Sequence, residues 1–296
     1  MAIHKNILHN GEIRPSENPE LRAGQIGLLA GWGVFTTLRI ADGVPFAWER
    51  HWARMSRDAR LLNVPMPPDA DVVEQDLLTL IDANAQENCT LRLVIVRNSG
   101  GMWEDTASKE TAIDVIALTA DSKKWGDSVQ LGLQPNARFA GNEFAGAKIL
   151  SWGQNLTWAE RAQQQGLDEV VLLNQHGHVA ECTSANIFAV FGKDVLTPPL
   201  ADGCLPGITR EVLLEAVQEA VQADDIRVSE GTLTVDDLYR AQSVFITSTT
   251  RDLLPVRRIA GREVAASDAV REKLSAAFRS YLSTDVAHRK QLRALA

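Results

Sequence analysis

Apolar and polar positions alternate along several short stretches of the chain, a pattern typical of β-strands. In the first third, "NILHNGEI" and "GVFTTLRIADGVPFAW" each place an Asn-Gly or Asp-Gly pair between two such stretches. These dipeptides favour the backbone of a type I′ turn, so both segments are predicted to be β-hairpins. "LRLVIVRN" and "AIDVIALTA" predict two further strands.

The periodicity becomes helical after Trp48. Apolar side chains recur at spacings of three and four residues from Trp48 to Leu62, which predicts a helix over 49–63. Three prolines between positions 65 and 68 end it. Asp69 is then in position to cap a second helix through "DADVVEQDLLTLIDANAQ".

The second half of the chain also mixes strands and helices. Strands are predicted at "DEVVLLN", "VAE", "ANIFAVF" and "QSVFITSTT", and helices near 151–165, after "DGCLPGIT" and over 267–283. The polar stretch "DSKKWGDS" at 121–128 is predicted to connect a small N-terminal domain, 1–120, to a larger domain, 129–296. Frequent hairpins without a regular βαβ rhythm indicate a mixed α/β (α+β) fold.

Composition limits the class of protein. The 296 residues are 45% hydrophobic and 23% charged, as in a soluble globular enzyme. A formal net charge of -8 argues against partners such as nucleic acid or an anionic membrane surface. No stretch predicts a signal peptide or a membrane span. Cys89, Cys182 and Cys204 are too few and too scattered for a disulfide framework or a zinc site, so we expect a reducing, cytoplasmic location and no metal.

Lys148 is the first candidate for chemistry. It stands among small residues in "AGAKILSWGQN", with apolar side chains directly after it. A lysine that forms a Schiff base reacts in its unprotonated form, which a partly dry setting favours. The alternative is an ordinary lysine whose amine reaches solvent near a helix start.

Three further signals are weak when each is taken alone. Glu181 falls where the strand "VAE" ends, and the alternative is a surface glutamate. In "GCLPGITRE", Gly207 precedes Ile208 and Thr209, whose N–H groups at a helix start suit a phosphate; alternatively Thr209 only caps the helix. Four hydroxyls over 247–250 follow another strand and either bind the same phosphate or form an ordinary loop.

Arg54 adds a cationic group, one helical turn after His51. It flanks the apolar stripe of the helix predicted over 49–63, so its guanidinium can point inward and bind a phosphate. The alternative is a surface salt bridge. An amine, a carboxylate, an arginine and two phosphate-binding turns are together the parts that a pyridoxal phosphate enzyme needs.

In this order and spacing, the chain resembles the class IV (fold type IV) pyridoxal phosphate-dependent aminotransferases. This family includes branched-chain aminotransferases, D-amino acid transaminases, (R)-amine transaminases and aminodeoxychorismate lyases. The resemblance covers nearly the whole chain and rests on "GVFTTLR", "HWARM", "AGAKILSWGQN", "VAECTSANIF", "LPGITRE" and "FITSTT". It implies pyridoxal 5′-phosphate as cofactor and a small N-terminal α/β domain followed by a larger α/β pseudo-barrel domain.

The resemblance also implies the role of each position. Lys148 matches the lysine that binds the cofactor covalently, and Glu181 matches the glutamate beside the pyridine nitrogen; both are the expected catalytic residues. The expected cofactor-binding residues are Arg54, Lys148, Glu181, Gly207, Ile208, Thr209, Ser248 and Thr249. The expected substrate-binding residues are Phe35, Arg92, Arg97 and Thr250. Arg92 and Arg97 lie five apart on one predicted strand and therefore on opposite faces, so only one of them is expected in the pocket.

The activity implied is amino transfer between an amino acid, branched-chain or another small apolar one, and an α-keto acid by a ping-pong Schiff-base mechanism. Two positions depart from the branched-chain pattern: Gly153 stands where a tyrosine is usual, and "VFTT" replaces "VFEG". "RNSGG" at 97–101 is similar to a stretch of aminodeoxychorismate lyases, and "SWGQN" to one of (R)-amine transaminases. A pyruvate-releasing lyase, a D-amino acid or (R)-amine transaminase, and a non-catalytic cofactor-binding protein are the alternatives.

A homodimer is the assembly that the resemblance implies, with the partner's small domain closing each active site. Five aromatic residues over 32–52 are more than the small domain needs, which favours an apolar face that a partner covers. The alternative is that these aromatic side chains fill the small domain's own core.

Overall fold

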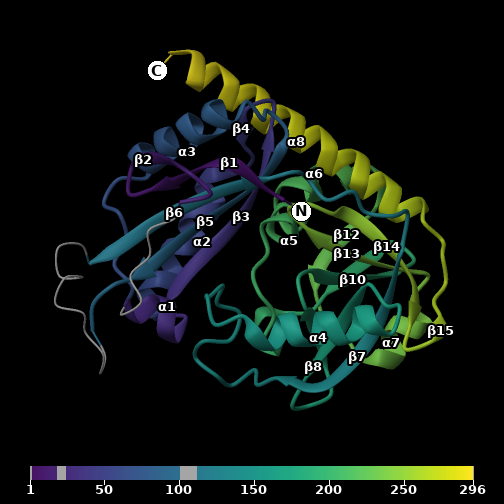
Figure 1. The fold of residues 1–296 in the computed structure, drawn as a ribbon. Coiled ribbons are helices and arrows are strands. Elements are labelled where there is room, and N and C mark those ends of the chain that lie inside the picture. The colour runs from purple at the N-terminus through teal and green to yellow at the C-terminus, as the bar shows by residue number, and fades with distance from the viewer. Residues whose placement is uncertain (1, 19–24, 101–111, 296) are drawn as a thin grey trace. The chain divides into compact units, whose positions relative to one another are not determined.

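The computed structural model describes residues 2–18, 25–100 and 112–295 (Figure 1). Its contacts divide the chain into two compact units. The first contains residues 1–123, 148–152 and 284–296, and the second contains 124–147 and 153–283. The division at 123/124 falls within the predicted connector at 121–128, and the segments 148–152 and 284–296 join the first unit. The domain boundaries at 120 and 129 themselves stay a prediction.

An antiparallel sheet forms the centre of the first unit. Among the described residues its order is β2-β1-β6-β5-β3-β4. The strands are β1 (Ile3–His9), β2 (Glu12–Pro15), β3 (Gly33–Ala41), β4 (Val44–Pro45), β5 (Cys89–Arg97) and β6 (Ile113–Ala120). Both predicted hairpins are confirmed, because Asn10, Gly11, Asp42 and Gly43 all have positive φ between paired strands. Gly101, the last residue of "RNSGG", lies outside the described residues.

Helices cover this sheet. They are α1 (Ile26–Ala30), α2 (Trp48–Leu61) and α3 (Ala70–Asn84). The side chain of Asp69 accepts hydrogen bonds from two N–H groups at the start of α3, as predicted. Helix α2 packs against β3, and α3 packs against β1 and β6 (Figure 1). Three of the five aromatic residues over 32–52, Phe35, Phe46 and Trp48, are buried inside this unit. For these three, the expectation of an exposed apolar face was wrong.

The end of the last helix also belongs to the first unit. Helix α8 spans Ala269–Leu295 and is longer than the predicted 267–283. Its later turns are rich in charged residues, which concealed the helical periodicity. Arg289 on α8 is nevertheless buried, because it forms ion pairs with Glu49 on α2 and with Glu74 on α3, the latter at 2.8 Å.

The second unit is built around a larger mixed sheet. Its order is β12-β11-β10-β13-β14-β7-β8-β9, with β15 beside β14. The strands are β7 (Val129–Arg138), β8 (Glu169–Asn174), β9 (Val179–Cys182), β10 (Asn186–Phe191), β11 (Asp194–Thr197), β12 (Arg227–Glu230), β13 (Ser243–Ser248), β14 (Asp252–Ile259) and β15 (Arg262–Glu263). The Cys182 N–H donates to the Ala185 carbonyl at 2.7 Å, so the edge strand β9 turns directly back into the central strand β10. The sheet therefore curls into part of a barrel around an apolar core.

Short helices surround this sheet. They are α4 (Gly153–Gln164), α5 (Ile208–Leu214), α6 (Ala216–Val221), α7 (Val235–Arg240) and the 3-10 turns η2 (Leu200–Asp202) and η3 (Gln222–Asp224). Helix α4 packs on β7 and β8 (Figure 1). The one helix predicted after "DGCLPGIT" is two helices, α5 and α6, which meet at Glu215. No helix in the described segments has both the length and the apolar character needed to cross a membrane.

Candidate active site

Lys148 lies on an extended segment, whereas the alternative interpretation placed it near a helix start. The Phe35 N–H donates to the Lys148 carbonyl at 3.1 Å, and the Leu150 N–H donates to the Gly33 carbonyl at 3.0 Å. Residues 148–150 therefore run antiparallel to the start of β3. A Cβ atom at Gly33 would lie 2.4 Å from the Ile95 carbonyl oxygen and 2.6 Å from Leu150, so only glycine permits this close approach.

Two aromatic rings surround the amine of Lys148. Its Nζ lies 4.5 Å from the ring centroid of Phe35 and 4.9 Å from that of Trp152. These rings meet edge to face, with centroids 5.6 Å apart. Lys148 as a whole is half-buried. The faces of the two rings attract the amine electrostatically, so they hold it in position.

The backbone of Lys148 is held by a residue that the sequence analysis missed. Asp58 on α2 is fully buried, and its Oδ2 accepts a hydrogen bond from the Lys148 N–H at 3.0 Å. Its other oxygen accepts from the guanidinium of Arg57. The signal for Asp58 was its spacing, because it lies four residues after Arg54 and therefore on the same side of the helix.

His51 and Arg54 meet at a buried hydroxyl. Thr36 Oγ1 accepts a hydrogen bond from Arg54 Nη2 at 2.8 Å and lies 2.6 Å from His51 Nδ1. Arg54 is 7% exposed, so it points inward and is not a surface salt bridge. Burial holds the pKa of His51 well below its usual 6.5, and the nearby charges of Arg54 and Lys148 lower it further. Thr36 is the third residue of "VFTT" and stands where "VFEG" has a glutamate. This difference therefore places a hydroxyl beside Arg54.

The two candidate arginines on β5 lie in different surroundings. The guanidinium of Arg92 lies 4.6 Å from the Phe35 ring centroid, and Arg92 is exposed. The guanidinium of Arg97 lies 4.1 Å from the Trp32 ring and donates to the carbonyls of Asn63 and Ser99. Arg92 therefore shares an aromatic ring with Lys148, while Arg97 is bound to backbone elsewhere in the unit.

Glu181 lies on β9 in the second unit and is 6% exposed. Each of its carboxylate oxygens has a donor: Arg138 Nε reaches Oε1 at 3.0 Å, and the Leu205 N–H reaches Oε2 at 3.0 Å. Arg138 also donates to Asn155 Oδ1 at 3.2 Å, so its guanidinium is fixed in turn. Arg138 was not among the residues predicted from the sequence, because no strand was predicted over 129–138.

The loop before α5 requires glycine at position 207. Asn186 donates from Nδ2 to the Leu205 carbonyl at 2.7 Å. A Cβ atom at Gly207 would lie 2.0 Å from Asn186 Oδ1, so any larger residue would displace this contact. Ile208 and Thr209 form the first turn of α5, as predicted, and Gly207 rather than Thr209 is its N-cap residue.

Two buried hydroxyls in this unit lack partners. Within the described part of the chain, Thr209 Oγ1 and Thr247 Oγ1 are buried without any hydrogen bond. Thr247 lies opposite Asn186 across the β10–β13 ladder, and it precedes Ser248, Thr249 and Thr250, which are half-buried. Unsatisfied buried hydroxyls are costly, so a bound ligand that accepts their hydrogen bonds would be stabilised here. These atoms fit the phosphate of a cofactor.

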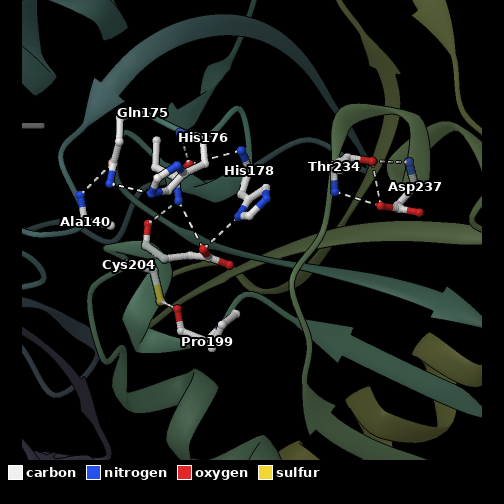
Figure 2. Close-up of polar contacts among 10 residues, drawn as sticks. Ala140, Gln175, His176, His178, Pro199, Cys204, Thr234 and Asp237 are labelled. Atoms are coloured by element: carbon white, nitrogen blue, oxygen red, sulfur yellow. Dashed lines mark hydrogen bonds and ion pairs between the residues drawn. The ribbon is translucent and has the colours of Figure 1, made fainter.

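A polar cluster supports the segment that leads into the loop at 204–207 (Figure 2). Asn174 donates to Asp202 Oδ1 at 3.1 Å, and His178 Nδ1 lies 3.1 Å from the same oxygen. Gln175 Oε1 accepts from the Ala140 N–H at 2.9 Å (Figure 2). The hairpin between β8 and β9 is thereby attached to η2, which leads directly into the loop at 204–207.

The cysteines and possible metal ligands have no evident chemical role. All three cysteines are buried and unpaired. Burial raises the pKa of the Cys204 thiol to about 12, and the charge of Glu181 adds to this effect, so the thiol is unreactive at neutral pH. Within residues 2–18, 25–100 and 112–295, no three His, Cys, Asp or Glu side chains are arranged to hold a metal ion.

The candidate residues form two groups, one in each unit. The first unit holds Phe35, Arg54, Arg92 and Lys148, with Arg97 in separate surroundings. The second unit holds Glu181, the loop from Gly207 to Thr209, and the turn over 248–250. These groups suit the three parts of pyridoxal phosphate. An amine recognises its aldehyde, an arginine and hydroxyls recognise its phosphate, and a carboxylate recognises its ring nitrogen.

The family model for amino-transferase class IV matches residues 33–259. A provisionally named branched-chain-amino-acid aminotransferase of Methanocaldococcus jannaschii is 30% identical over 260 residues, which cover 87% of this chain and 89% of the relative. A D-alanine aminotransferase of Bacillus licheniformis is 25% identical over 277 residues, covering 88% and 90%. The crystal structure of a branched-chain aminotransferase of Thermoproteus uzoniensis with norvaline has a TM-score of 0.82 at 22% identity and covers 95% of both chains.

The chain belongs to the class IV aminotransferase family. Its architecture is that of fold type IV, which the structural likeness confirms. Enzymes of this family depend on pyridoxal phosphate, so pyridoxal 5′-phosphate is the cofactor, as the sequence predicted.

Proposed function

We propose that the protein is a pyridoxal phosphate-dependent aminotransferase that moves an amino group between a small apolar amino acid, such as a branched-chain one, and an α-keto acid. One observation carries the proposal. Lys148 is half-buried, its amine lies close to the rings of Phe35 and Trp152, and Asp58 holds its backbone. A fixed amine with limited access to water is what covalent chemistry at a carbonyl requires.

The residues that hold the cofactor are proposed from their positions and chemistry. Arg54, Ile208, Thr209, Ser248 and Thr249 bind the phosphate, and Gly207 leaves the backbone N–H groups of the α5 turn accessible. The two unpartnered hydroxyls in the second unit support this assignment. Glu181 would bind the ring nitrogen, and its carboxylate is oriented by Arg138 and by the Leu205 N–H.

The cofactor, when bound, supplies an electrophilic aldehyde and a conjugated ring that accepts electrons from the substrate's α-carbon. The residues of the chain move protons and orient groups. Lys148 would hold the cofactor covalently through Nζ, and its amine, once free, would accept the proton from the substrate's α-carbon and return it as an acid. Glu181 keeps a proton on the ring nitrogen through its negative charge, which stabilises the charge that develops on the ring.

The substrate contacts are proposed to come from Phe35, Arg92 and Thr250. The Lys148 amine and the Arg92 guanidinium both lie over the ring of Phe35. A molecule bound there would contact an amine, a guanidinium and an apolar ring. An amino acid with a small apolar side chain has the matching groups. Arg97 is a weaker candidate, because backbone carbonyls already occupy its donors. The relative from Methanocaldococcus jannaschii, named for branched-chain amino acids, supports this substrate class.

The functional unit is proposed to be a homodimer, in keeping with the family resemblance. Leu28 and Leu29 on α1 are 52% and 59% exposed, which leaves an apolar surface on the first unit that a second copy can bury. A symmetric dimer is the most common assembly for such a surface.

A panel of amino donors tests the proposal and separates it from the alternatives. Leucine, isoleucine, valine, alanine, their D-enantiomers and an (R)-amine are each supplied with 2-oxoglutarate or pyruvate. Aminodeoxychorismate is supplied without an acceptor. Transfer from the L-branched-chain donors is the expected result. Preference for D-alanine or the (R)-amine would identify a different transaminase, pyruvate release without an acceptor would identify a lyase, and binding of the cofactor without turnover would identify a non-catalytic protein.

A further inference from the structure

His51 is a fully buried side chain for which the proposed reaction has no role so far. It lies on α2, one turn before Arg54, and its Nε2 atom is buried with no hydrogen-bond partner in the described part of the chain. Residues three apart on a helix lie on the same side. The charge of Lys148 is close enough to His51 to lower its pKa. The unpartnered nitrogen therefore lies in the same region of the first unit as the reactive lysine and the phosphate-binding arginine.

The hydroxyl of Thr36 contacts both Arg54 and His51 and can select the tautomer of the imidazole. A hydroxyl has one hydrogen to donate, and a guanidinium can only donate. Arg54 Nη2 donates to Thr36 Oγ1 at 2.8 Å, which leaves the hydroxyl hydrogen for another acceptor. His51 Nδ1, 2.6 Å away, can accept it. When Thr36 donates in this way, the hydrogen of the neutral imidazole is on Nε2, and this N–H is the donor without a partner.

A buried N–H without an acceptor is destabilising, and an anionic oxygen satisfies it best. The carboxylate of Asp58 offsets only one of the two positive charges of Arg54 and Lys148, so a negatively charged ligand is favoured over a neutral one. Burial, and after it the charges of Arg54 and Lys148, hold the pKa of His51 well below its usual value, so the neutral ring can contribute a hydrogen-bond donor without a further positive charge.

We propose that His51 Nε2–H donates a hydrogen bond to the cofactor's phosphate, next to the contact from Arg54, and that Thr36 fixes the imidazole tautomer needed for this. The inference rests on the proposed function, because it assumes that Arg54 binds this phosphate. His51 is then a binding residue for the cofactor, and Thr36 is a positioning residue that acts through it.

Two substitutions separate the two nitrogens. His51→Asn keeps a short polar group near Thr36 and removes the distal N–H, whereas His51→Gln keeps an amide N–H at the distal position. Pyridoxal phosphate and pyridoxal, which lacks the phosphate, are titrated into each apoprotein. His51→Asn is expected to weaken the binding of pyridoxal phosphate about tenfold, as for the loss of one charge-assisted hydrogen bond. His51→Gln is expected to stay near the parent, and pyridoxal is expected to bind equally to all three proteins.

Inorganic phosphate is the second probe, because it binds without the pyridine ring. It is expected to raise the melting temperature of the parent and of His51→Gln more than that of His51→Asn. If His51→Asn keeps the parent's preference for pyridoxal phosphate over pyridoxal, or loses affinity for both alike, His51 does not contact the phosphate. If the parent itself binds no pyridoxal phosphate, the proposed function fails instead.

A measurement on the unsubstituted protein covers the case in which His51→Asn does not fold. With ¹⁵N-labelled histidine, the His51 ring is expected to show a protonated Nε2 at pH 7 whose proton resonance shifts when pyridoxal phosphate is added. A hydrogen on Nδ1, or an Nε2–H resonance whose chemical shift does not change when the cofactor is added, would overturn the proposal.

Discussion

Arg138 donates a hydrogen bond from Nε to Glu181 Oε1 at 3.0 Å, inside the second unit. The Leu205 N–H occupies the other carboxylate oxygen, also at 3.0 Å. Glu181 is 6% exposed, so water competes little with these two donors. The carboxylate is thus fixed in orientation before any ligand binds, as a group that stabilises developing charge must be.

The charge of Glu181 is expected to matter more than its hydrogen bonds. In Glu181→Gln, turnover should fall about 100-fold, because an amide cannot keep the ring nitrogen protonated, while the cofactor still binds. Steady-state kinetics with saturating cofactor measure the effect, and Glu219→Gln on the exposed surface of α6 is the matched control. Turnover near the parent's value in Glu181→Gln would remove this residue from the mechanism.

Arg54 is expected to contribute to cofactor affinity rather than to chemistry. Arg54→Ala should lose roughly 1.5–3 kcal/mol of binding free energy for pyridoxal phosphate, as for a charge-assisted hydrogen bond to phosphate. The turnover of the saturated enzyme should change much less. Arg60→Ala, on the same helix but exposed, is the control. Equal cofactor affinity in the two variants would show that Arg54 does not bind the phosphate.

The burial of His51 predicts a dependence of stability on pH. Its pKa in the folded protein is well below the unfolded value of about 6.5. The unfolded chain therefore binds more protons below pH 6.5, and the stabilisation that neutral His51 provides at higher pH is lost as the pH falls. The free energy of unfolding should decrease by up to about 1.4 kcal/mol per pH unit from this residue. Urea unfolding of the apoprotein at pH 5.0, 6.0 and 7.5 measures the slope, which should be shallower in His51→Gln; identical slopes would contradict the assignment.

Dilution is expected to reduce activity and thermal stability together. If Leu28 and Leu29 lie in a dimer interface, the monomer exposes them and also lacks the partner's contribution to the active site. Analytical ultracentrifugation across the concentration range of the activity assay measures both states, and Leu29→Glu should shift the equilibrium toward monomer. A monomer with full activity at the assay concentration would contradict a shared active site.

Local patterns predicted most elements of the fold because their signals lie in adjacent residues. The Asn10-Gly11 turn and the cap at Asp69 were identified in this way, as each depends on the backbone preferences of a few positions. The end of α8 was missed because its burial depends on Arg289 pairing with Glu49 and Glu74, more than 200 positions away in sequence. Such contacts leave no periodicity in the sequence.

The candidate site shows the same distinction. The reactive groups were recognisable from their motifs, but the residues that hold them were not. Asp58 is bonded to the Lys148 backbone across 90 positions, and Arg138 to Glu181 across 43. The spacing from Arg54 places Asp58 on one side of α2 but does not reveal its partner, and no local motif marks Arg138. Both roles arise only where segments distant in sequence meet.

Lys148 is the residue on which the account depends, and reduction of the holoenzyme tests it most directly. The purified protein with pyridoxal phosphate is treated with borohydride, digested, and mapped by mass spectrometry, in parallel with the same protein after incubation with L-leucine. We expect reduction to fix the cofactor to Lys148 in the first sample, and the amino acid to prevent this labelling because it displaces the lysine and converts the cofactor to its amino form. Labelling at another lysine, or at Lys148 with no response to any amino donor, would contradict it.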